Sequence, residues 1–488
     1  MRKVSGVIGG CLLALCAMPA LGQDGDLDKQ IREGLNLSGY VLEDLALPAD
    51  PGQAFEVLVT IDGQDMLVQL EPWSLRSDRF EVLVDDGTGA LVPYNAPAPR
   101  TYRGTVVDHP QSVVAGSLLP EGLSVMISMP SKHDGTESYF IQPLAEVVEG
   151  QPAERHVVYS AAQTLDTGKI CGVDHNVDML DLGQEITRPD LGDRVDVYEQ
   201  AEIAFDADFP FYQLNGSDTN QTIADIENVM ATVTLVYERD VDITYDITTI
   251  IVRTSSGSDP YSATESGTLL NQFVNNWNAT QGGVQRDVAH LMTGRNLNGS
   301  VIGVAFLSVI CNVSNAYGLS QSRFTGSLNS RAALTAHEIG HNWSAQHCDG
   351  NSGCQIMCSG LGGCSGLNPL QFGPNATAQI VNFRNTRNCL DEVVDGIIPL
   401  PFFDDFATGS VDSTLWGNNS GATVAFNFNA PSDNFVLNLD GSDSLETLDL
   451  EAANPPGPIQ VSFQSAHIGV ENGESLIIEA LNDQGNLA

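Results

Sequence analysis

The spacing of hydrophobic residues divides the chain into a strand-rich first part and a mixed part that begins near residue 195. In the first part, from about 35 to 165, short apolar runs such as 55–59 and 80–84 are separated by Gly, Pro and Asp turns. Short runs bounded by such turns are typical of β-strands. The first part is therefore predicted to be a β-rich unit.

Helix and strand patterns alternate in the part that follows. Two runs have apolar residues every three or four positions and predict amphipathic helices, one on Ile223, Ile226, Met230, Val233 and Tyr237 and the other on Leu270, Phe273 and Trp277. Residues 241–247 alternate between apolar and polar, as a half-buried strand does, and 301–307 is a further apolar strand. We expect a mixed sheet flanked by helices, which belongs to the α/β (α+β) fold class.

A third pattern follows residue 394. Residues 395–401 contain two prolines and a glycine and are predicted to be a linker. The span 402–488 has strand-like runs between Gly, Asn and Asp turns at 435–439, 459–463 and 475–481. This pattern predicts a jelly-roll-like β-sandwich, and the short span indicates that the sandwich is small or incomplete.

Composition and charge limit the kinds of molecule that the protein is expected to bind. The 488 residues are 42% hydrophobic, so the predicted units can bury cores and wholesale disorder is excluded. There are 21 Lys and Arg residues against 62 Asp and Glu residues, which gives a formal net charge of −41. Such a surface repels nucleic acid and anionic lipid, so we expect neither nucleic acid nor a membrane as a partner.

Residues 1–22 have the features of a secretory signal peptide. Two basic residues precede a short apolar run over 7–15, and small residues end the segment before Gln23. The run is shorter than the about 20 residues that a membrane-spanning helix needs. Cys16 does not indicate a lipoprotein anchor, because a bulky leucine precedes it. The sequence therefore predicts a secreted, soluble protein that is cleaved before Gln23.

The nine cysteines are unevenly distributed. Two lie within 1–22, Cys171 stands alone in the middle of the chain, and six are crowded into one later stretch, namely Cys311, Cys348, Cys354, Cys358, Cys364 and Cys389. Six cysteines in an oxidising compartment predict three disulfides. The count leaves Cys171 without a disulfide partner.

The residues with the clearest chemistry form the string from His337 to His347. His337 and His341 are four residues apart, so on a helix both imidazoles reach one metal ion, and Glu338 lies beside that face. His347 is too far along to bind if the helix continues, so the chain is expected to turn back near Ser344. Three neutral imidazoles leave a fourth position for water, as a catalytic zinc ion requires.

On this string and on several others the sequence resembles the reprolysin (adamalysin) branch of the metzincin zinc endopeptidases. The further strings are Glu202 to Asp208, Arg286 to Gly294, the methionine turn Cys354 to Met357, and Asn388 to Leu390, with Tyr102 to Val106 and Tyr139 to Leu144 resembling the propeptide of that family. The resemblance covers roughly 40–394.

The resemblance implies a zinc-dependent endopeptidase made as a zymogen. The implied organisation is a propeptide over 23–194 and a catalytic domain over 195–394 with a mixed five-stranded sheet. Glu338 would be the general base that takes a proton from zinc-activated water, and Met357 would support the metal site. The strand over 301–306 would pair with extended protein or peptide substrates.

Further implications concern calcium, one disulfide and one departure from the family. A structural calcium site would use Glu202, Asp287, Cys389 and, in place of the asparagine of the family, Glu392, whereas solvated carboxylates are the alternative. One disulfide is expected to be Cys311–Cys389, and the other four cysteines are expected to pair among themselves. The family has glycine where this chain has Ser344, and a left-handed backbone there would cost serine about 1–2 kcal/mol.

Cys171 is predicted to act as a cysteine switch. Zinc binds thiolate strongly, so a cysteine presented to the fourth position would displace the reactive water. The string from Lys169 to Asp174 also resembles the cysteine switch of reprolysin propeptides. A buried free cysteine or an intermolecular disulfide is the alternative, and His175 is another candidate ligand. Cleavage between Asp174 and Val195 is expected to release activity.

Two other classes of function compete with the peptidase hypothesis. One is a secreted adhesion protein with an idle metzincin domain, but lineages that lose activity commonly lose a ligand or the glutamate, and all four residues are present here. The other is a protein dominated by its C-terminal domain, with a carbohydrate or cell-surface ligand. The sequence gives no legible site for such a ligand.

Overall fold

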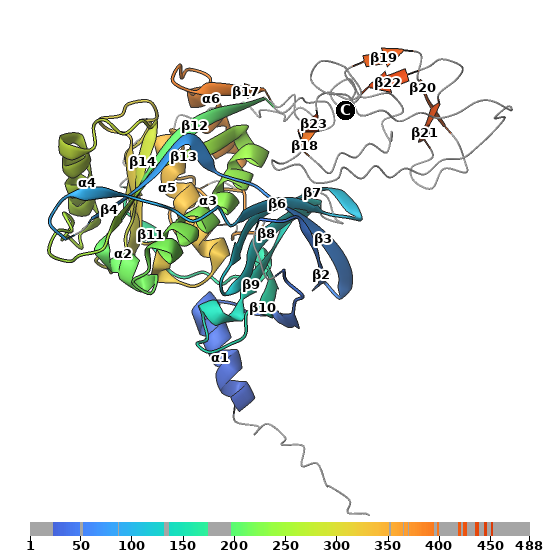
Figure 1. Ribbon diagram of the computed structural model, residues 1–488, viewed down its shortest axis with the longest axis horizontal. Helices are drawn as coiled ribbons and strands as arrows, with labels where there is room; N and C mark the ends of the chain where they lie inside the picture. The colour runs from blue at the N-terminus through green and yellow to red at the C-terminus, as the bar shows by residue number, and fades with distance from the viewer. Residues whose placement is uncertain are drawn as a thin grey trace, which may run out of the picture.

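The structure is a computed structural model. It describes residues 23–48, 52–85, 87–130, 136–173, 197–350, 353–364, 366–368 and 370–394, with short strands between 398 and 451. Several predictions lie outside the described residues: the signal peptide, the stretch that contains His175, the linker apart from 398–399, and most of the C-terminal sandwich. Figure 1 shows the arrangement of the two large sheets.

The first part of the chain forms an antiparallel, barrel-like sheet. Helix α1 (Gln23–Leu35) precedes eight strands in the order β1 (Val41–Asp44), β10 (Arg155–Ser160), β9 (Thr136–Pro143), β8 (Gly122–Pro130), β7 (His109–Leu119), β6 (Thr101–Val106), β3 (Gln64–Pro72) and β2 (Phe55–Ile61). The two end strands lie close to each other, and the Thr60 backbone N–H on β2 donates to the Glu43 carboxylate on β1. We call this unit the N-terminal barrel.

The second sheet is mixed and has nine strands. Its order is β11 (Ile170–Cys171), β15 (Val301–Ala305), β16 (Tyr317–Ser320), β14 (Val288–Met292), β12 (Val197–Ala207), β13 (Ile243–Arg253), β4 (Arg76–Asp85) and β5 (Leu91–Tyr94), with β17 (Asp391–Val394) paired to β12. Most pairs are parallel, while β15 is antiparallel to β16. The predicted mixed sheet with flanking helices is confirmed.

Helices cover both faces of the second sheet. They are α2 (Phe209–Leu214), α3 (Thr219–Val241), α4 (Ser266–Thr280), α5 (Leu328–Asn342) and α6 (Pro374–Arg384), with short 3₁₀ turns at Leu144–Glu146, Ala161–Gln163 and Ser322–Phe324. Alternate residues of β12 serve the two faces, because Ile203 and Phe205 join the core with α3 and α5, whereas Ala204 joins the core with α4. This alternation is the period of two expected of a strand that is buried on both faces.

One part of the organisation was not predicted from the sequence. The run 80–84 is a strand, as expected, and the five strands from β13 to β15 all come from 195–394. The sheet is nevertheless larger, because β4, which contains 80–84, together with β5 and β11 extends these five strands at both edges. Strand patterns specify that a segment is extended, but not which sheet it joins, because partner choice depends on tertiary contacts.

After residue 394 the described residues form three two-stranded pairs. These are β18 (Ile398–Pro399) with β23 (Leu450–Glu451), β19 (Asn418–Ser420) with β22 (Ser444–Glu446), and β20 (Thr423–Phe426) with β21 (Phe435–Asn438). The β-sandwich therefore stays a prediction. Within the described part of the chain, no helix has both the length and the apolar character needed to cross a bilayer.

Candidate metal centre

Helix α5 carries two of the three histidines on one face. The Ser327 hydroxyl caps its first turn by accepting from the Ser330 backbone N–H. All residues of the helix are buried, because the sheet lies on one side of it and α3 on another. His337 and His341 are therefore one turn apart inside the protein, with 3% and 0% of their surfaces exposed.

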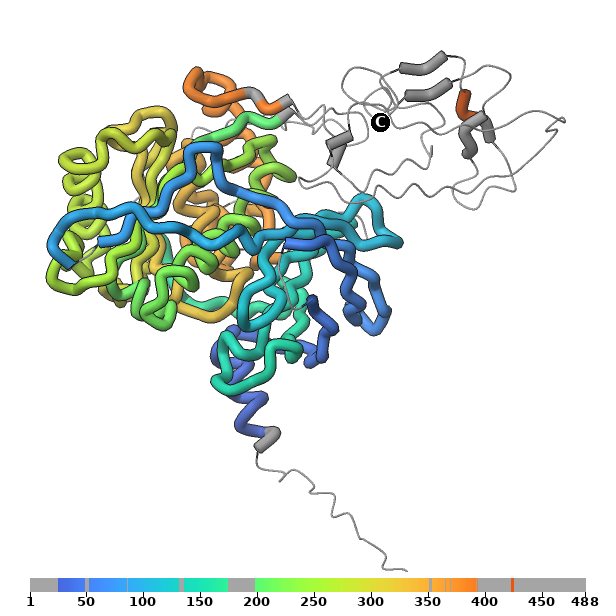
Figure 2. Tube along the Cα trace, viewed as in Figure 1, coloured from blue at the N-terminus to red at the C-terminus, as the bar shows by residue number. Residues whose placement is uncertain are grey.

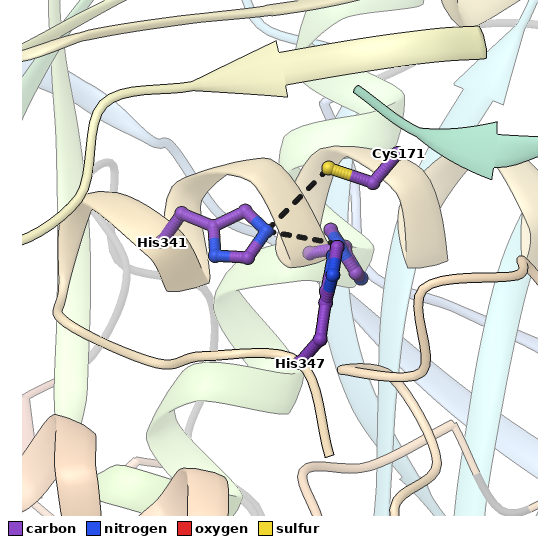
Figure 3. A group of neighbouring side chains, drawn as sticks. Cys171, His341 and His347 are labelled. Carbon is purple, nitrogen blue, oxygen red and sulfur yellow. Dashed lines mark hydrogen bonds between the residues drawn. The ribbon is translucent and has the colours of Figure 1, made fainter. Parts of the chain in front are cut away.

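The chain turns back where the sequence predicted. Helix α5 ends at Asn342, and Ser344 adopts a left-handed backbone with φ of 81°. The Ala345 backbone N–H donates to the Gly340 carbonyl, and the Trp343 indole N–H donates to the Tyr245 hydroxyl, which together hold the turn. This reversal brings His347 back to the two histidines of the helix (Figure 3).

Ser344→Gly is expected to raise the free energy of unfolding by about 0.5–1 kcal/mol. Relief of the left-handed strain, about 1–2 kcal/mol, is partly offset by the greater entropy of glycine in the unfolded chain. Ser344→Ala is the control, because it keeps the strain and, like the glycine variant, removes the bond that the Ser308 hydroxyl donates to Ser344. Urea unfolding should rank stability as Gly, then Ser, then Ala; a glycine variant less stable than the alanine variant contradicts the strain argument.

The three imidazoles bring their Nε2 atoms to one point. The Nδ1 atoms of His337 and His341 lie 2.7 Å from the carbonyl oxygens of Ile356 and Ala345, so each Nδ1 carries the proton that it donates. The Nε2 atoms are then acceptors, yet His337 Nε2 is 3.1 Å from both His341 Nε2 and His347 Nε2. The lone pairs of His337 and His341 at this separation repel each other unless a cation lies between them.

Cys171 supplies a fourth candidate ligand atom. Its Sγ lies 3.5 Å from His341 Nε2, and it forms one group with the three histidines, whose ligand atoms all lie within 4.8 Å of one another. A tetrahedral zinc ion with ordinary bond lengths would have ligand atoms about 3.3 Å apart between nitrogens and about 3.6 Å apart between nitrogen and sulfur. The residues present therefore fit zinc.

A short edge strand holds Cys171 in this position. The Ile170 backbone N–H in β11 donates to the carbonyl of Ser300, next to β15, and the Gly172 N–H just after β11 donates to the carbonyl of Gly303 in β15. On the other side, the Cys171 N–H donates to the Ser359 carbonyl and the Leu361 N–H donates to the Lys169 carbonyl. The cysteine thus lies between the edge of the sheet and the loop 359–361.

Glu338 lies beside the histidines, and its carboxylate contacts the Cys171 thiol rather than an imidazole. Its Oε2 accepts from the Cys171 thiol at 3.6 Å, and its Oε1 has no hydrogen-bond partner among the described residues. Burial raises the pKa of the Glu338 carboxyl well above its usual range, and burial together with Glu338 also raises the pKa of the Cys171 thiol. A buried carboxylate with a raised pKa is suited to accept and return a proton.

Gly303 lies in the candidate centre and was not predicted from the sequence. A Cβ at this residue of β15 would lie 2.3 Å from Glu338 Oε1, which is closer than any real contact. Glycine therefore makes room for the carboxylate against the sheet. The only signal in the sequence was a glycine inside an apolar strand, which often marks close approach of another group.

The methionine turn lies beneath the histidines. Met357 is fully buried, and its Sδ would be 2.9 Å from a Cβ placed on Gly340 in α5, so the sulfur packs directly under the helix. The preceding Ile356 carbonyl accepts from His337 Nδ1 and so fixes the orientation of that ring. The sequence prediction identified the turn but not this carbonyl.

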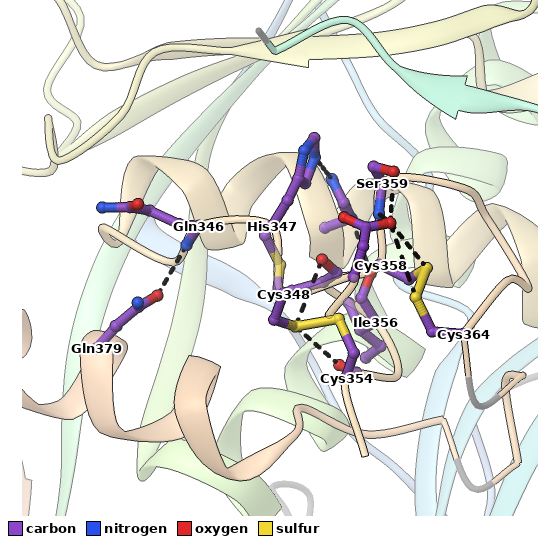
Figure 4. Close-up of a disulfide and its surroundings, with 12 residues drawn as sticks. Gln346, His347, Cys348, Cys354, Ile356, Cys358, Ser359, Cys364 and Gln379 are labelled. Atoms are coloured by element: carbon purple, nitrogen blue, oxygen red, sulfur yellow. Dashed lines mark hydrogen bonds between the residues drawn. A yellow bond between two sulfur atoms is a disulfide. The ribbon is translucent and has the colours of Figure 1, made fainter. Parts of the chain in front are cut away.

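Three disulfides join the six late cysteines. Cys311 is joined to Cys389, the pair that the family resemblance implied, and the other pairs are Cys348–Cys354 and Cys358–Cys364. Figure 4 shows these last two on either side of the turn below His347. The Cys358–Cys364 bridge closes the loop that contacts β11, and Cys171 has no disulfide partner.

The calcium ligands expected from the resemblance are only partly placed. The Glu202 backbone N–H donates to the Asp287 carboxylate at 2.8 Å, and Asp287 lies near the Cys311–Cys389 bridge. Burial raises the pKa of Asp287 to about 6. The side chain of Glu392 lies outside the described residues, so calcium binding stays a prediction.

Comparisons with known proteins agree with this geometry. Residues 198–388 match the family described as Reprolysin_5, Metallo-peptidase family M12. The chain carries a reprolysin-type M12 metallopeptidase domain. M12 is a family of zinc metalloendopeptidases, and the N-terminal barrel with β4, β5 and β11 is a propeptide-like region ahead of the M12 domain.

Individual relatives share parts of this chain. Disintegrin and metalloproteinase domain-containing protein 19 of Mus musculus is 27% identical over 271 residues, which are 54% of this chain and 28% of that protein. Zinc metalloproteinase-disintegrin-like ammodytagin of Vipera ammodytes ammodytes is 40% identical over 74 residues, which are 15% of this chain and 37% of that protein. The chain thus spans 28% and 37% of the lengths of these two relatives.

A solved structure also resembles the chain. Metalloproteinase-II from Bacteroides fragilis is 13% identical, and the match covers 68% of this chain and 92% of that one with a TM-score of 0.37.

Proposed function

We propose that the protein is a secreted, zinc-dependent endopeptidase made as a zymogen, which cleaves peptide bonds in proteins. The observation that carries the proposal is the convergence of three histidine Nε2 atoms and the Cys171 sulfur beside the buried carboxylate of Glu338. A structural histidine cluster has no need of an adjacent buried carboxylate, nor of a glycine that makes room for it.

Each residue of the centre has a distinct role in this proposal. His337, His341 and His347 would hold zinc, which when bound polarises a substrate carbonyl and acidifies water. Glu338 accepts a proton through its carboxylate and later returns it to the leaving amine. The edge strand β15 offers its backbone groups to an extended substrate, which binds as an added strand.

The proposed latency of the peptidase follows from the segment that occupies the edge of β15. The β11 segment takes the backbone groups of β15 that a substrate would use, and Cys171 takes the fourth position around the histidines. Removal of the β11 segment would expose the edge of β15 and the fourth position around the histidines together. Secretion is supported by the three disulfides, because such bonds persist in oxidising compartments, and by the predicted signal peptide over 1–22.

The test of the proposed function is cleavage of denatured proteins by the purified protein after cleavage between 174 and 196. We expect new peptide termini by mass spectrometry, their loss with a chelator, and their return with zinc. A protein that binds zinc yet produces no fragments under any of these conditions would instead support the hypothesis of an adhesion protein with an idle domain.

Gly303→Ala is expected to lower turnover at least tenfold while the zinc content is unchanged. The added methyl group cannot share space with Glu338 Oε1, so the carboxylate must move away from the histidines. A displacement of a catalytic group by about 1 Å can lower the reaction rate by about 10²-fold. Turnover and zinc content are measured on the same sample, and parental turnover in the variant would show that Gly303 does not position Glu338.

A further inference from the structure

Propeptide-like strands lie at both edges of the catalytic sheet. β11 pairs with β15 beside the histidines, while β4 pairs with β13 at the opposite edge, followed by β5. The two attachments differ in size, because β11 has two residues and β4 has ten. Figure 1 shows the blue β4 beside the strands of the M12 domain.

The β4–β5 hairpin is an excursion from the N-terminal barrel. It lies between β3 and β6, which are themselves antiparallel neighbours with Pro72 opposite Tyr102, and the Trp73 backbone N–H donates to the Thr101 carbonyl. The barrel therefore closes at the base of the hairpin, and residues 74–100 project onto the other domain (Figure 2). The hairpin adds no strand to the barrel, so its contacts serve the M12 domain.

Side chains of the hairpin enter the hydrophobic layers on both faces of the catalytic sheet. Leu75 and Val82 are 1% and 2% exposed and join the core that contains α3 and α5. Leu83 and Leu91 pack against the core on the opposite face, which contains α4. The main chain of β4 is paired in parallel register with Thr249 to Arg253 of β13, so β13 has no open edge along these five residues.

Polar contacts fix the same position. Arg76 on β4 donates through Nε and Nη2 to both carboxylate oxygens of Glu227 on α3, at 2.5 and 3.1 Å, and Glu227 is 2% exposed. The Tyr94 hydroxyl on β5 donates to the Asn220 side chain. A two-point ion pair of this kind fixes the position of the hairpin on α3, because both hydrogen bonds require one orientation of the guanidinium group.

We propose that the β4–β5 hairpin is a second anchor, independent of zinc, that keeps the cleaved propeptide bound to the edge of β13. This inference rests on the proposed zymogen. Cleavage between 174 and 196 cuts the chain but leaves every contact of the hairpin intact, and departure of the hairpin exposes the β13 edge and parts of both cores. Release of the propeptide is therefore a separate step from cleavage.

The test uses the full chain with a site-specific protease sequence placed between 174 and 196. After cleavage, the two fragments of the Cys171→Ala variant are expected to co-elute on size exclusion at micromolar concentration, because the hairpin does not need the thiol. Prompt separation of these fragments would overturn the proposal.

A matched pair of substitutions then assigns the anchor to the hairpin, because the barrel also contacts α3, for example where Asn228 donates to Ser124. Val82→Asp places a charge in the buried face, whereas Val92→Asp places it on the same hairpin where the side chain is 40% exposed. The fragments of Val82→Asp are expected to dissociate at least tenfold faster than those of Val92→Asp. Equal rates would overturn the proposal.

A third variant replaces residues 74–100 by a two-residue Asn-Gly turn between β3 and β6, which are already neighbours. Fast dissociation of its cleaved propeptide supports the anchor, and parental dissociation contradicts it. All readouts are of binding rather than peptidase activity. A lack of peptidase activity would thus contradict the proposed function, whereas the dissociation rates would still decide whether the hairpin is an anchor.

Discussion

Glu338→Ala is expected to lower the turnover of protein substrates by about 10²–10⁴-fold while zinc remains bound, which is the range that a lost general base costs. The carboxylate is fully buried beside the histidines and contacts the Cys171 thiol, and burial raises its pKa. The three imidazoles keep their own contacts through the carbonyls of Ile356 and Ala345, so the substitution leaves their orientation intact.

Turnover and zinc content are measured together for Glu338→Ala, Glu338→Gln and the parent. The glutamine variant is the matched control for packing, since it keeps the shape of the side chain and lacks the basic oxygen. Both variants are expected to be inactive and fully loaded with zinc. Parental turnover in either variant would exclude Glu338 as the base, and loss of zinc in both would make Glu338 a ligand.

Cys171→Ala is expected to give a protein that is at least tenfold more active than the parent before any cleavage. The sulfur is the group that the propeptide-like region directs at the histidines, at 3.5 Å from His341 Nε2. Alanine keeps the backbone bonds of β11 but cannot occupy the fourth position, so substrate competes only with a two-residue strand.

The control for this prediction is Ile170→Ala, the neighbouring residue of β11. Ile170 is 39% exposed, and its replacement leaves the thiol in place, so this variant is expected to stay latent. Activity of uncleaved proteins is compared on one peptide substrate. A Cys171→Ala variant as latent as the parent would show that the thiol does not maintain latency.

Local features of the centre could be predicted from the sequence because they depend on spacing along one helix and one turn. The four-residue step from His337 to His341 requires a helix, and the distance to His347 requires a reversal. The reversal appears at Ser344, with the left-handed backbone that the comparison with glycine implied. The helix periodicity at Ile223 to Tyr237 likewise lies within α3.

Nonlocal features could not be predicted from the sequence. The alternation at 80–84 is compatible with either sheet, and only contacts with β13 and its two cores decide between them. The close approach of Gly303 to Glu338, and the carbonyls that orient His337 and His341, are backbone placements set by packing. Side-chain types along the chain give no direct signal for such placements.

X-ray absorption at the zinc edge of the intact, uncleaved protein tests the central claim most directly. The account predicts one zinc ion per chain with three nitrogen ligands at about 2.0–2.1 Å and one sulfur at about 2.3 Å, and replacement of the sulfur by oxygen in Cys171→Ala. A spectrum without sulfur in the parent, or one that Cys171→Ala leaves unchanged, would contradict a zinc centre that Cys171 holds latent.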